Sequence, residues 1–268
     1  MDDVSEVLPL LTRIAEATTV SLVWGTATRF FAGLGFGRVN YGYTRFLNDR
    51  SIGDPEDVVF LTTADPEYAR RYFSGGLYAK TPIFRWAQTN SGACTWSWVR
   101  GAMERGELTP EEVAAVRQNL AMGISAGITV SFPETSSRAK GALGLIADAG
   151  IDHDAVEGIW AARREEIMAV ANMMHLKIVQ LPGANRRRAL TQRQREALEW
   201  VADGKTMQDI ALLMEVSHAM VEKHLRLARE ALDVDTTAQA VAKAALLNMI
   251  FQKDGANVPP ANPATAAR

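Results

Sequence analysis

The chain has 268 residues, of which 29 are Lys or Arg and 31 are Asp or Glu, giving a formal net charge of −2. Hydrophobic residues make up 47% and charged residues 22%, a balance typical of globular proteins that excludes disorder along the whole chain. A single cysteine excludes a disulfide framework, and four histidines argue against a metal centre. No apolar run reaches about 18 residues and the N-terminus lacks the basic start of a signal peptide, so we expect a cytoplasmic protein with no membrane partner.

The first 180 residues mix helical with strand-like patterns. An amphipathic pattern that includes Leu10 and Ile14 predicts an N-terminal helix. The later predicted elements are strands at 38–46 and 58–63, helices near 66–75, 82–90 and 110–122, strands at 127–132 and 142–147, and a long helix from Asp152, its N-cap, to Gln180. Alternating helices and strands of this kind predict an α+β domain, an α-β-α sandwich with helices on both faces of an antiparallel sheet.

A change in composition separates this part from the rest. The segment LPGANRRRA at 181–189 holds a helix-breaking Pro-Gly pair and three consecutive arginines, so we expect a linker there. The last residues, 253–268, are rich in Pro, Ala and Asn, and we expect a disordered tail. The predicted organisation is therefore a sensor domain at 1–180, the linker, a second domain at 190–252 and the tail.

Four short helices are predicted in the second domain. Their caps are Thr191, Thr206, Ser217 and Thr236, and a Gln follows the first and last caps by three residues, which completes capping boxes. Gly204 is expected to end the first helix. One apolar stripe of the third helix consists of Val221, Leu225, Ala228 and Leu232. The domain is predicted to be all-α.

The second and third helices, joined by a three-residue turn, form a helix-turn-helix pattern, in which the latter helix enters the DNA major groove. The side chains of that helix that point away from the apolar stripe are His218, Ala219, Glu222, Lys223 and Arg226. Arg226 suits the edge of guanine, Lys223 a base or phosphate, and Glu222 cytosine. At this point the alternative is the solvated face of a helix in another kind of all-α domain.

The run LTQRQREALEWVADGKTMQDIALLMEVSHAMVEKHLRLAREAL resembles the DNA-binding domain of LuxR-type transcription factors. The resemblance implies binding to a double-stranded DNA operator by a homodimer, with RNA polymerase as a further candidate partner. It adds Thr206, Ser217 and His224 to the candidate DNA contacts. Met220 stands where the family generally has Thr, so one hydroxyl–phosphate contact is lost.

The charge of the second domain is not that of a strong DNA binder. Residues 190–250 carry seven basic and nine acidic side chains. Neutralisation of phosphates should therefore give only modest non-specific affinity. A dimer on two half-sites is the natural way to gain affinity.

LuxR-type DNA-binding domains occur with different sensors, and the first 180 residues lack the acidic cluster and phosphoacceptor Asp of a receiver domain. They resemble instead the autoinducer-binding domain of the quorum-sensing LuxR branch, through Gly-Leu-Gly-Phe at 33–36, the Tyr68 and Tyr72 pair, Pro82, Trp96 and Gly-Ile-Thr at 127–129. In that family such side chains surround an N-acyl-homoserine lactone. The resemblance places these residues at the ligand: Tyr68, Tyr72, Thr81, Pro82, Trp96, Gly127 and Ala147. Core packing of the same aromatic residues is the alternative.

Three departures bear on the ligand. Thr81 stands where the family has an Asp that accepts the ligand's amide N–H, and a neutral hydroxyl accepts a weaker bond. Ala147 stands where many members have Ser or Thr, and Tyr68 replaces a Trp. The expected signal is therefore a lactone held mainly by its tail, an unrelated small apolar molecule, or none.

The expected function is that of a ligand-responsive, sequence-specific transcriptional regulator rather than an enzyme. The sequence shows no nucleophile–base signature, phosphate-binding glycine loop or metal spacing, and we expect no cofactor. Cys94 is expected to be a buried, unreactive thiol, because no Lys, Arg or His adjoins it in sequence. The alternative functions are an orphan regulator that responds to a non-lactone ligand or to none, and a protein that sequesters another LuxR-type partner.

Overall fold

The computed structural model describes residues 4–47, 52–182 and 189–252. These residues divide into two compact units, the first ending at Val179 and the second beginning at Gln180. Most of the predicted linker (183–188) and the predicted tail (253–268) lie outside the described residues.

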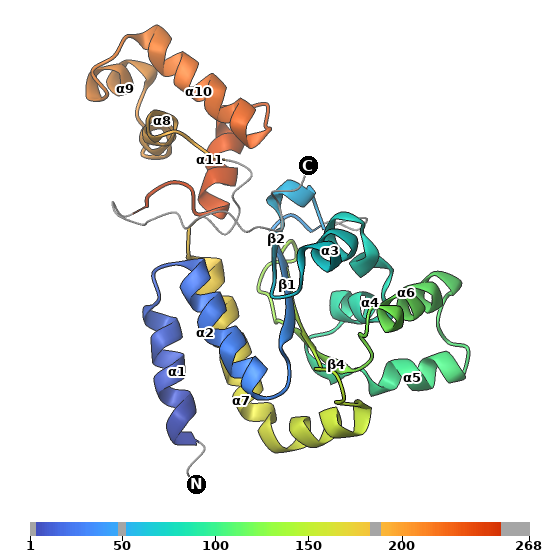
Figure 1. Cartoon of the computed structure of the whole chain (residues 1–268). Helices are drawn as coiled ribbons and strands as arrows, with labels where there is room; N and C mark the ends of the chain where they lie inside the picture. Colours follow the sequence, from blue (N-terminus) through green and yellow to red (C-terminus); the bar gives the residue numbers. More distant parts are fainter. Residues whose placement is uncertain (1–3, 48–51, 183–188, 253–268) are drawn as a thin grey trace. The chain divides into compact units, whose positions relative to one another are not determined.

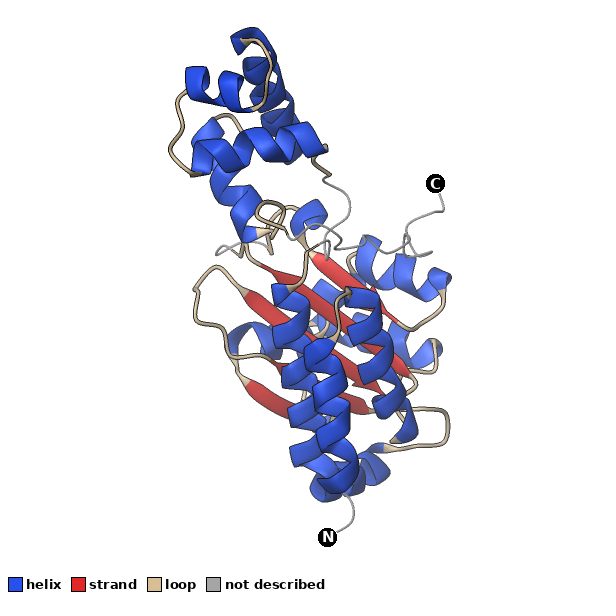
Figure 2. Ribbon diagram, turned by 90° about the vertical axis from the view of Figure 1, so that its left-hand side faces the viewer, coloured by secondary structure: helices blue, strands red, loops and turns tan. Residues whose placement is uncertain are grey.

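The first unit is built on a five-stranded sheet with the order β2-β1-β5-β4-β3. All neighbouring strands run antiparallel, and Tyr41 of β1 lies opposite Leu143 of β5 (Figure 2). The strands are β1 (Arg38–Thr44), β2 (Val59–Thr62), β3 (Gly92–Thr95), β4 (Gly127–Ser131) and β5 (Lys140–Ile146).

Helices lie on both sides of this sheet (Figure 1). One side carries α1 (Val4–Glu16), α2 (Val20–Gly33) and α7 (His153–Gln180). The other carries α3 (Pro66–Ala69), α4 (Pro82–Thr89), α5 (Ser97–Glu104) and α6 (Pro110–Ala121), with short turns at Pro55–Asp57, Arg70–Ser74 and Leu77–Lys80. The predicted α-β-α sandwich is confirmed.

The side chains of β1 point alternately to the two faces of the sheet, and this determines which of them contacts which layer of helices. Successive residues of a strand point to opposite faces. The Tyr41 hydroxyl lies 2.9 Å from Nδ1 of His175, on α7. The preceding residue, Asn40, points to the other face, where its side-chain nitrogen donates to the Tyr68 hydroxyl on α3. Neighbouring residues of β1 thus contribute polar groups to the two opposite faces of the sheet.

Several predicted boundaries in this unit were wrong. Neither β3 nor α5 was predicted, because both are too short for a period to show. The helix expected at 66–75 is the four-residue α3 followed by a wider π turn at Arg70–Ser74. β1 ends at Thr44, two residues early, because the Thr44 hydroxyl accepts the backbone N–H of Phe46 (3.0 Å).

The second unit contains α8 (Gln192–Ala202), α9 (Met207–Leu213), α10 (His218–Leu232) and α11 (Thr237–Leu246). The four predicted caps are confirmed, including the Gln-containing boxes at Thr191 and Thr236. Gly204 follows α8 with a φ of +77° and Glu215 turns the chain before α10 with a φ of +56°. The predicted stripe of α10 is buried in the core of this unit. No helix in the described part of the chain is long and apolar enough to cross a bilayer.

Candidate ligand pocket and DNA-binding surface

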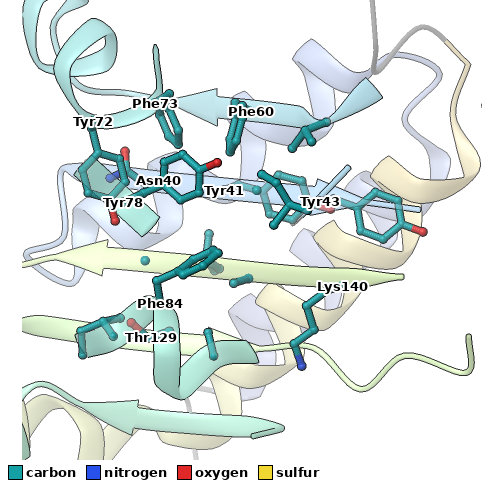
Figure 3. A pocket seen from close by; sticks show the side chains of 18 of the residues that line it. Asn40, Tyr41, Tyr43, Phe60, Tyr72, Phe73, Tyr78, Phe84, Thr129 and Lys140 are labelled. Atoms are coloured by element: carbon teal, nitrogen blue, oxygen red, sulfur yellow. The ribbon is translucent and has the colours of Figure 1, made fainter. Parts of the chain in front are cut away.

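A pocket opens between the second face of the sheet and the segment that runs from α3 to α4 (Figure 3). Its empty volume, mouth included, is about 920 Å³. The aromatic residues of this segment, of β2 and of the loop after β3 that line it are Phe60, Tyr68, Tyr72, Phe73, Tyr78, Phe84 and Trp96. We call this space the main pocket. A concave, mostly apolar pocket with a few polar groups is the usual form of a small-molecule site.

The aromatic rings support one another along the wall of the pocket. Tyr68 and Tyr72 stack with ring centroids 5.2 Å apart and planes inclined by 16°. Phe60 and Phe73 lie 4.6 Å apart. Burial, with a smaller contribution from Tyr78, raises the pKa of Tyr72 to about 12, and burial likewise raises the pKa of Tyr68. Both hydroxyls therefore stay protonated and neutral at physiological pH.

A directed chain of hydrogen bonds ends at Tyr68. The backbone N–H of Ala64 donates to the Thr62 hydroxyl (3.0 Å), which donates to Oδ1 of Asn40 (2.7 Å). Nδ2 of Asn40 then donates to the Tyr68 hydroxyl (2.8 Å). Tyr68 accepts this bond, and the described residues provide no acceptor for its own proton. The Tyr68 O–H is thus left to donate to a guest in the main pocket.

Trp96 contributes a ring rather than a free donor. Its indole N–H donates to the Thr129 hydroxyl at 2.8 Å, and both residues line the main pocket. The indole N–H of Trp96 is therefore already engaged and is not free to donate to a guest.

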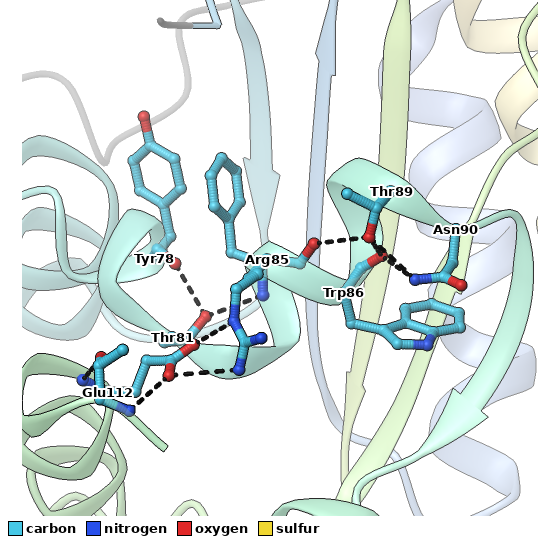
Figure 4. Close-up of polar contacts among 9 residues, drawn as sticks. Tyr78, Thr81, Arg85, Trp86, Thr89, Asn90 and Glu112 are labelled. Atoms are coloured by element: carbon cyan, nitrogen blue, oxygen red, sulfur yellow. Dashed lines mark hydrogen bonds and ion pairs between the residues drawn. The ribbon is translucent and has the colours of Figure 1, made fainter. Parts of the chain in front are cut away.

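Thr81 caps α4 and is not among the residues that line the main pocket; its contacts are drawn in Figure 4. Its hydroxyl donates to the Tyr78 carbonyl at 2.8 Å and accepts the backbone N–H of Phe84 at 3.2 Å. Its proton and one lone pair are therefore already committed to the local turn.

Beside it, an ion pair joins α4 to α6. Nε of Arg85 lies 2.6 Å from Oε1 of Glu112, whose other oxygen accepts the backbone N–H of Thr109 at 2.9 Å (Figure 4). Burial alone would raise the pKa of the Glu112 carboxyl, but the hydrogen bonds from Arg85 and Thr109 outweigh it and lower that pKa. The carboxylate therefore stays charged and holds the first turns of the two helices together.

A second cavity adjoins the main pocket. Thr81 and Pro82 line this cavity, together with residues of α5 and α6. The residues that line both spaces, and so form the wall between them, are Tyr72, Ile83, Trp96, Asn119 and Ile124. Asn119 was not among the predicted site residues, since a polar residue near the end of a helix gives no signal in the sequence.

Gly127 and Ala147, which the resemblance places at the ligand, are not among the residues that line either space. A Cβ on Gly127 would lie 2.3 Å from the carbonyl oxygen of Leu145 and 3.0 Å from the Trp96 ring. Glycine is needed there because two strands and a ring approach closely. Ala147 is buried and its backbone N–H donates to the Ala126 carbonyl at 3.0 Å.

Two further residues near the pocket carry chemistry of their own. Lys140 is the one charged side chain among the described residues that line the main pocket, and its ammonium donates to the Asn90 carbonyl at 3.0 Å. Cys94 lies on β3, where burial raises the pKa of the thiol to about 11. The side chain is half-buried rather than buried as predicted, and the raised pKa disfavours the reactive thiolate.

In the second unit, α10 presents an exposed polar face. Ser217, at the helix cap, and His218, Ala219, Glu222, Lys223 and Arg226 are all exposed, whereas His224 is half-buried. Thr206 is exposed and caps α9, and its backbone N–H and hydroxyl both donate to Asp209. The predicted DNA-contacting residues thus belong to α10 and its cap, together with the cap of α9. The Arg226 guanidinium forms an ion pair with Glu230, one turn further along α10.

The comparisons with known families decide what these two units are. Residues 19–178 match the autoinducer binding domain, and residues 188–244 match the bacterial regulatory proteins of the luxR family. The chain belongs to the luxR family. It is a ligand-responsive, DNA-binding transcriptional regulator of this family and not an enzyme.

The curated relatives of this LuxR-type regulator include quorum-sensing proteins. It is 32% identical over 218 residues to the quorum sensing-dependent transcriptional regulator RpaR of Rhodopseudomonas palustris, a match covering 78% of this chain and 83% of RpaR. It is 27% identical over 218 residues to the transcriptional activator TraR of Agrobacterium vitis, covering 78% and 84% of the two chains.

Solved structures show the same fold. SdiA in complex with octanoyl-rac-glycerol matches with a TM-score of 0.52 and 18% identity, over 94% of this chain and 99% of SdiA. The N-acylhomoserine lactone-dependent LuxR family factor CepR2 of Burkholderia cenocepacia matches with a TM-score of 0.51 and 17% identity, over 66% and 96%.

Proposed function

We propose that the main pocket binds a small neutral amphiphile, in the first candidate an N-acyl-homoserine lactone, and that binding controls operator occupancy by a homodimer. The main support is the Tyr68 hydroxyl, whose proton is left without an acceptor in the described part of the chain, at the end of the hydrogen-bonded chain from Ala64. A carbonyl oxygen of the signal would accept it. The apolar and aromatic walls suit an acyl chain or a ring.

The charge of the lining supports a neutral ligand. No carboxylate occurs among the described residues that line the main pocket, so a cationic guest would lack a counter-ion in an apolar site, which is costly. The resident ammonium of Lys140 is already hydrogen-bonded to Asn90.

In the second unit, we assign DNA recognition to α10. Its exposed face offers Arg226, Lys223 and Glu222 to base edges, and the cap residues Ser217 and Thr206 to the backbone. A dimer would place two such helices in successive major grooves, on half-sites about one helical turn apart. Ligand binding would stabilise the folded sensor by mass action and so favour the dimer. Contact with RNA polymerase belongs to the same proposal.

A second candidate is a regulator whose signal is an acyl compound other than a lactone. It is favoured by Thr81, which replaces the family Asp and whose hydroxyl is engaged with Tyr78 and Phe84. The bond that the Asp makes to a lactone's amide N–H therefore has no direct counterpart at this position.

One experiment tests both candidates. Small molecules extracted from the purified protein are identified by mass spectrometry, and melting is followed with acyl-homoserine lactones of graded chain length and with octanoyl-glycerol. A rise of several degrees with one lactone supports the first candidate, and a rise with octanoyl-glycerol alone supports the second. No extracted compound and no rise with any probe contradict ligand binding.

A further inference from the structure

We propose that Asn119 on α6 is the residue that accepts the ligand's N–H or O–H donor, in the role of the family Asp that Thr81 replaces. This proposal rests on the proposed ligand-binding function and adds a specificity-determining residue to it. The family resemblance does not assign Asn119, and it was not predicted from the sequence.

The main observation is a buried oxygen without a partner. Oδ1 of Asn119 is inaccessible to solvent and has no hydrogen-bond partner among the residues that the structure describes. An unpartnered buried carbonyl costs free energy, and folded proteins rarely keep one without a reason. Because this oxygen is inaccessible in the ligand-free chain, a ligand donor meets it only when the amide turns toward the cavity, and the bond then formed would relieve that cost.

Its position fits a ligand anchor. Asn119 lines the main pocket and the second cavity, beside Tyr72, Trp96 and Ile124. Ile124 and Trp96 pack in one cluster with Tyr68, so the donor of Tyr68 and the acceptor of Asn119 belong to the same end of the pocket. A head group with a carbonyl and an adjacent N–H or O–H would satisfy both.

The helix that carries Asn119 is held at both ends. Its first turn is fixed by the ion pair between Arg85 and Glu112. At its other end, the guanidinium of Arg38 donates to the carbonyls of Met122 (3.3 Å) and Gly123 (2.6 Å). A binding residue on such a fixed element loses little entropy when the ligand binds.

The test is a thermodynamic cycle that combines a substitution in the protein with a chemical change in the ligand probe. The full-length protein and its Asn119→Leu and Asn119→Asp variants are titrated with N-octanoyl-homoserine lactone and with its N-methyl amide, which lacks the N–H. In the parent protein we expect the N–H probe to bind at least about tenfold more tightly. Asn119→Leu should abolish that difference, and Asn119→Asp should keep it, because a carboxylate also accepts an N–H.

A second readout separates this role from a structural one. Because Asn119→Leu removes an unpartnered buried oxygen, the ligand-free variant should melt no lower than the parent protein while its affinity for the N–H probe falls. Asn90→Leu is the matched control, since Asn90 is exposed and lines neither cavity; it should leave the affinity unchanged.

Three outcomes would overturn the inference. Equal affinity of the parent and Asn119→Leu for the N–H probe would show that the oxygen does not meet the ligand, while the proposed function would stand. Loss of binding in Asn119→Asp with retention in Asn119→Leu would show that the residue donates rather than accepts. A parent protein that binds neither these probes nor octanoyl-glycerol would overturn the proposed function together with this inference.

Discussion

Asn40 of β1 donates its side-chain N–H to the hydroxyl of Tyr68 on α3 across 2.8 Å. Because Asn40 is itself oriented by Thr62, the bond fixes Tyr68 as an acceptor toward the sheet and leaves its proton for the pocket. A strand and a helix 28 residues apart in the chain thus cooperate to prepare one hydrogen-bond donor.

Tyr68→Phe should weaken ligand binding about tenfold. The substitution removes the donor and leaves the Asn40 amide without its partner, a loss of about 1–1.5 kcal/mol for a neutral hydrogen bond. The measurement is a titration with whichever probe raises the melting temperature of the parent protein. Thr62→Val, which disturbs the chain upstream but keeps the Tyr68 hydroxyl, should have a smaller effect. Equal losses in the two variants would contradict a direct contact between Tyr68 and the ligand.

Glu112→Gln should destabilise the sensor unit at neutral pH by about 1.5–3 kcal/mol, because it replaces charge-assisted bonds to Arg85 and Thr109. The pKa of Glu112 is lower in the folded chain than its unfolded value of about 4.3. The carboxylate therefore stabilises the fold above that value, and this contribution is lost as the pH falls through the folded pKa.

Urea unfolding at pH 7 and at acid pH checks this prediction. The difference in the free energy of unfolding between the parent protein and Glu112→Gln should become smaller as the pH falls. Glu111→Gln is the matched control: its carboxylate belongs to an exposed pair with Lys80, and it should change stability little at either pH. A difference in the free energy of unfolding that does not change with pH would contradict the assigned role of Glu112.

Gly127→Ala should destabilise the unit by about 1–3 kcal/mol, with or without ligand, because the added methyl overlaps the Leu145 carbonyl. Gly158→Ala makes the same change on α7, where a Cβ meets no atom within 4 Å; it should stabilise the helix by about 0.5–1 kcal/mol. Thermal melting of both variants gives the comparison. If Gly127→Ala changed ligand affinity and left stability untouched, the packing role of this glycine would be wrong.

Arg226→Ala should lower affinity for specific DNA by about 1–3 kcal/mol, roughly 5- to 150-fold, if it contacts a guanine. Fluorescence anisotropy with fragments selected from genomic DNA by the parent protein provides the measurement. Arg193→Ala, which removes an equally exposed arginine paired with Glu196 on α8, should leave specificity unchanged. Because Glu230 holds the Arg226 guanidinium in the free protein, Glu230→Gln should strengthen binding. An unchanged affinity of Arg226→Ala would remove α10 from the recognition surface at this position.

The second unit could be predicted closely from the sequence, because its structure is fixed by local signals. Thr191, Thr206 and Ser217 cap helices at the predicted places, and a period of three to four residues marks the buried side of α10. Caps and short-range periods act within a few residues of chain, so they can be recognised without the fold.

The sensor unit was predictable in its layers and its aromatic residues, but the details of its site depend on contacts between distant segments. The sequence shows that Thr81 stands at the position where the family has an Asp. It does not show that the Thr81 hydroxyl is hydrogen-bonded to the backbone of Tyr78 and Phe84. Gly127 and Ala147 stand in motif positions, but the sequence does not show that neither lines the two cavities or that a Cβ on Gly127 would meet the Leu145 carbonyl. Asn119 could not be identified from the sequence, because its place between the two cavities, beside Tyr72 and Trp96, depends on the packing of α6. Whether a buried oxygen has a hydrogen-bond partner likewise depends on which distant segments surround it in the folded chain.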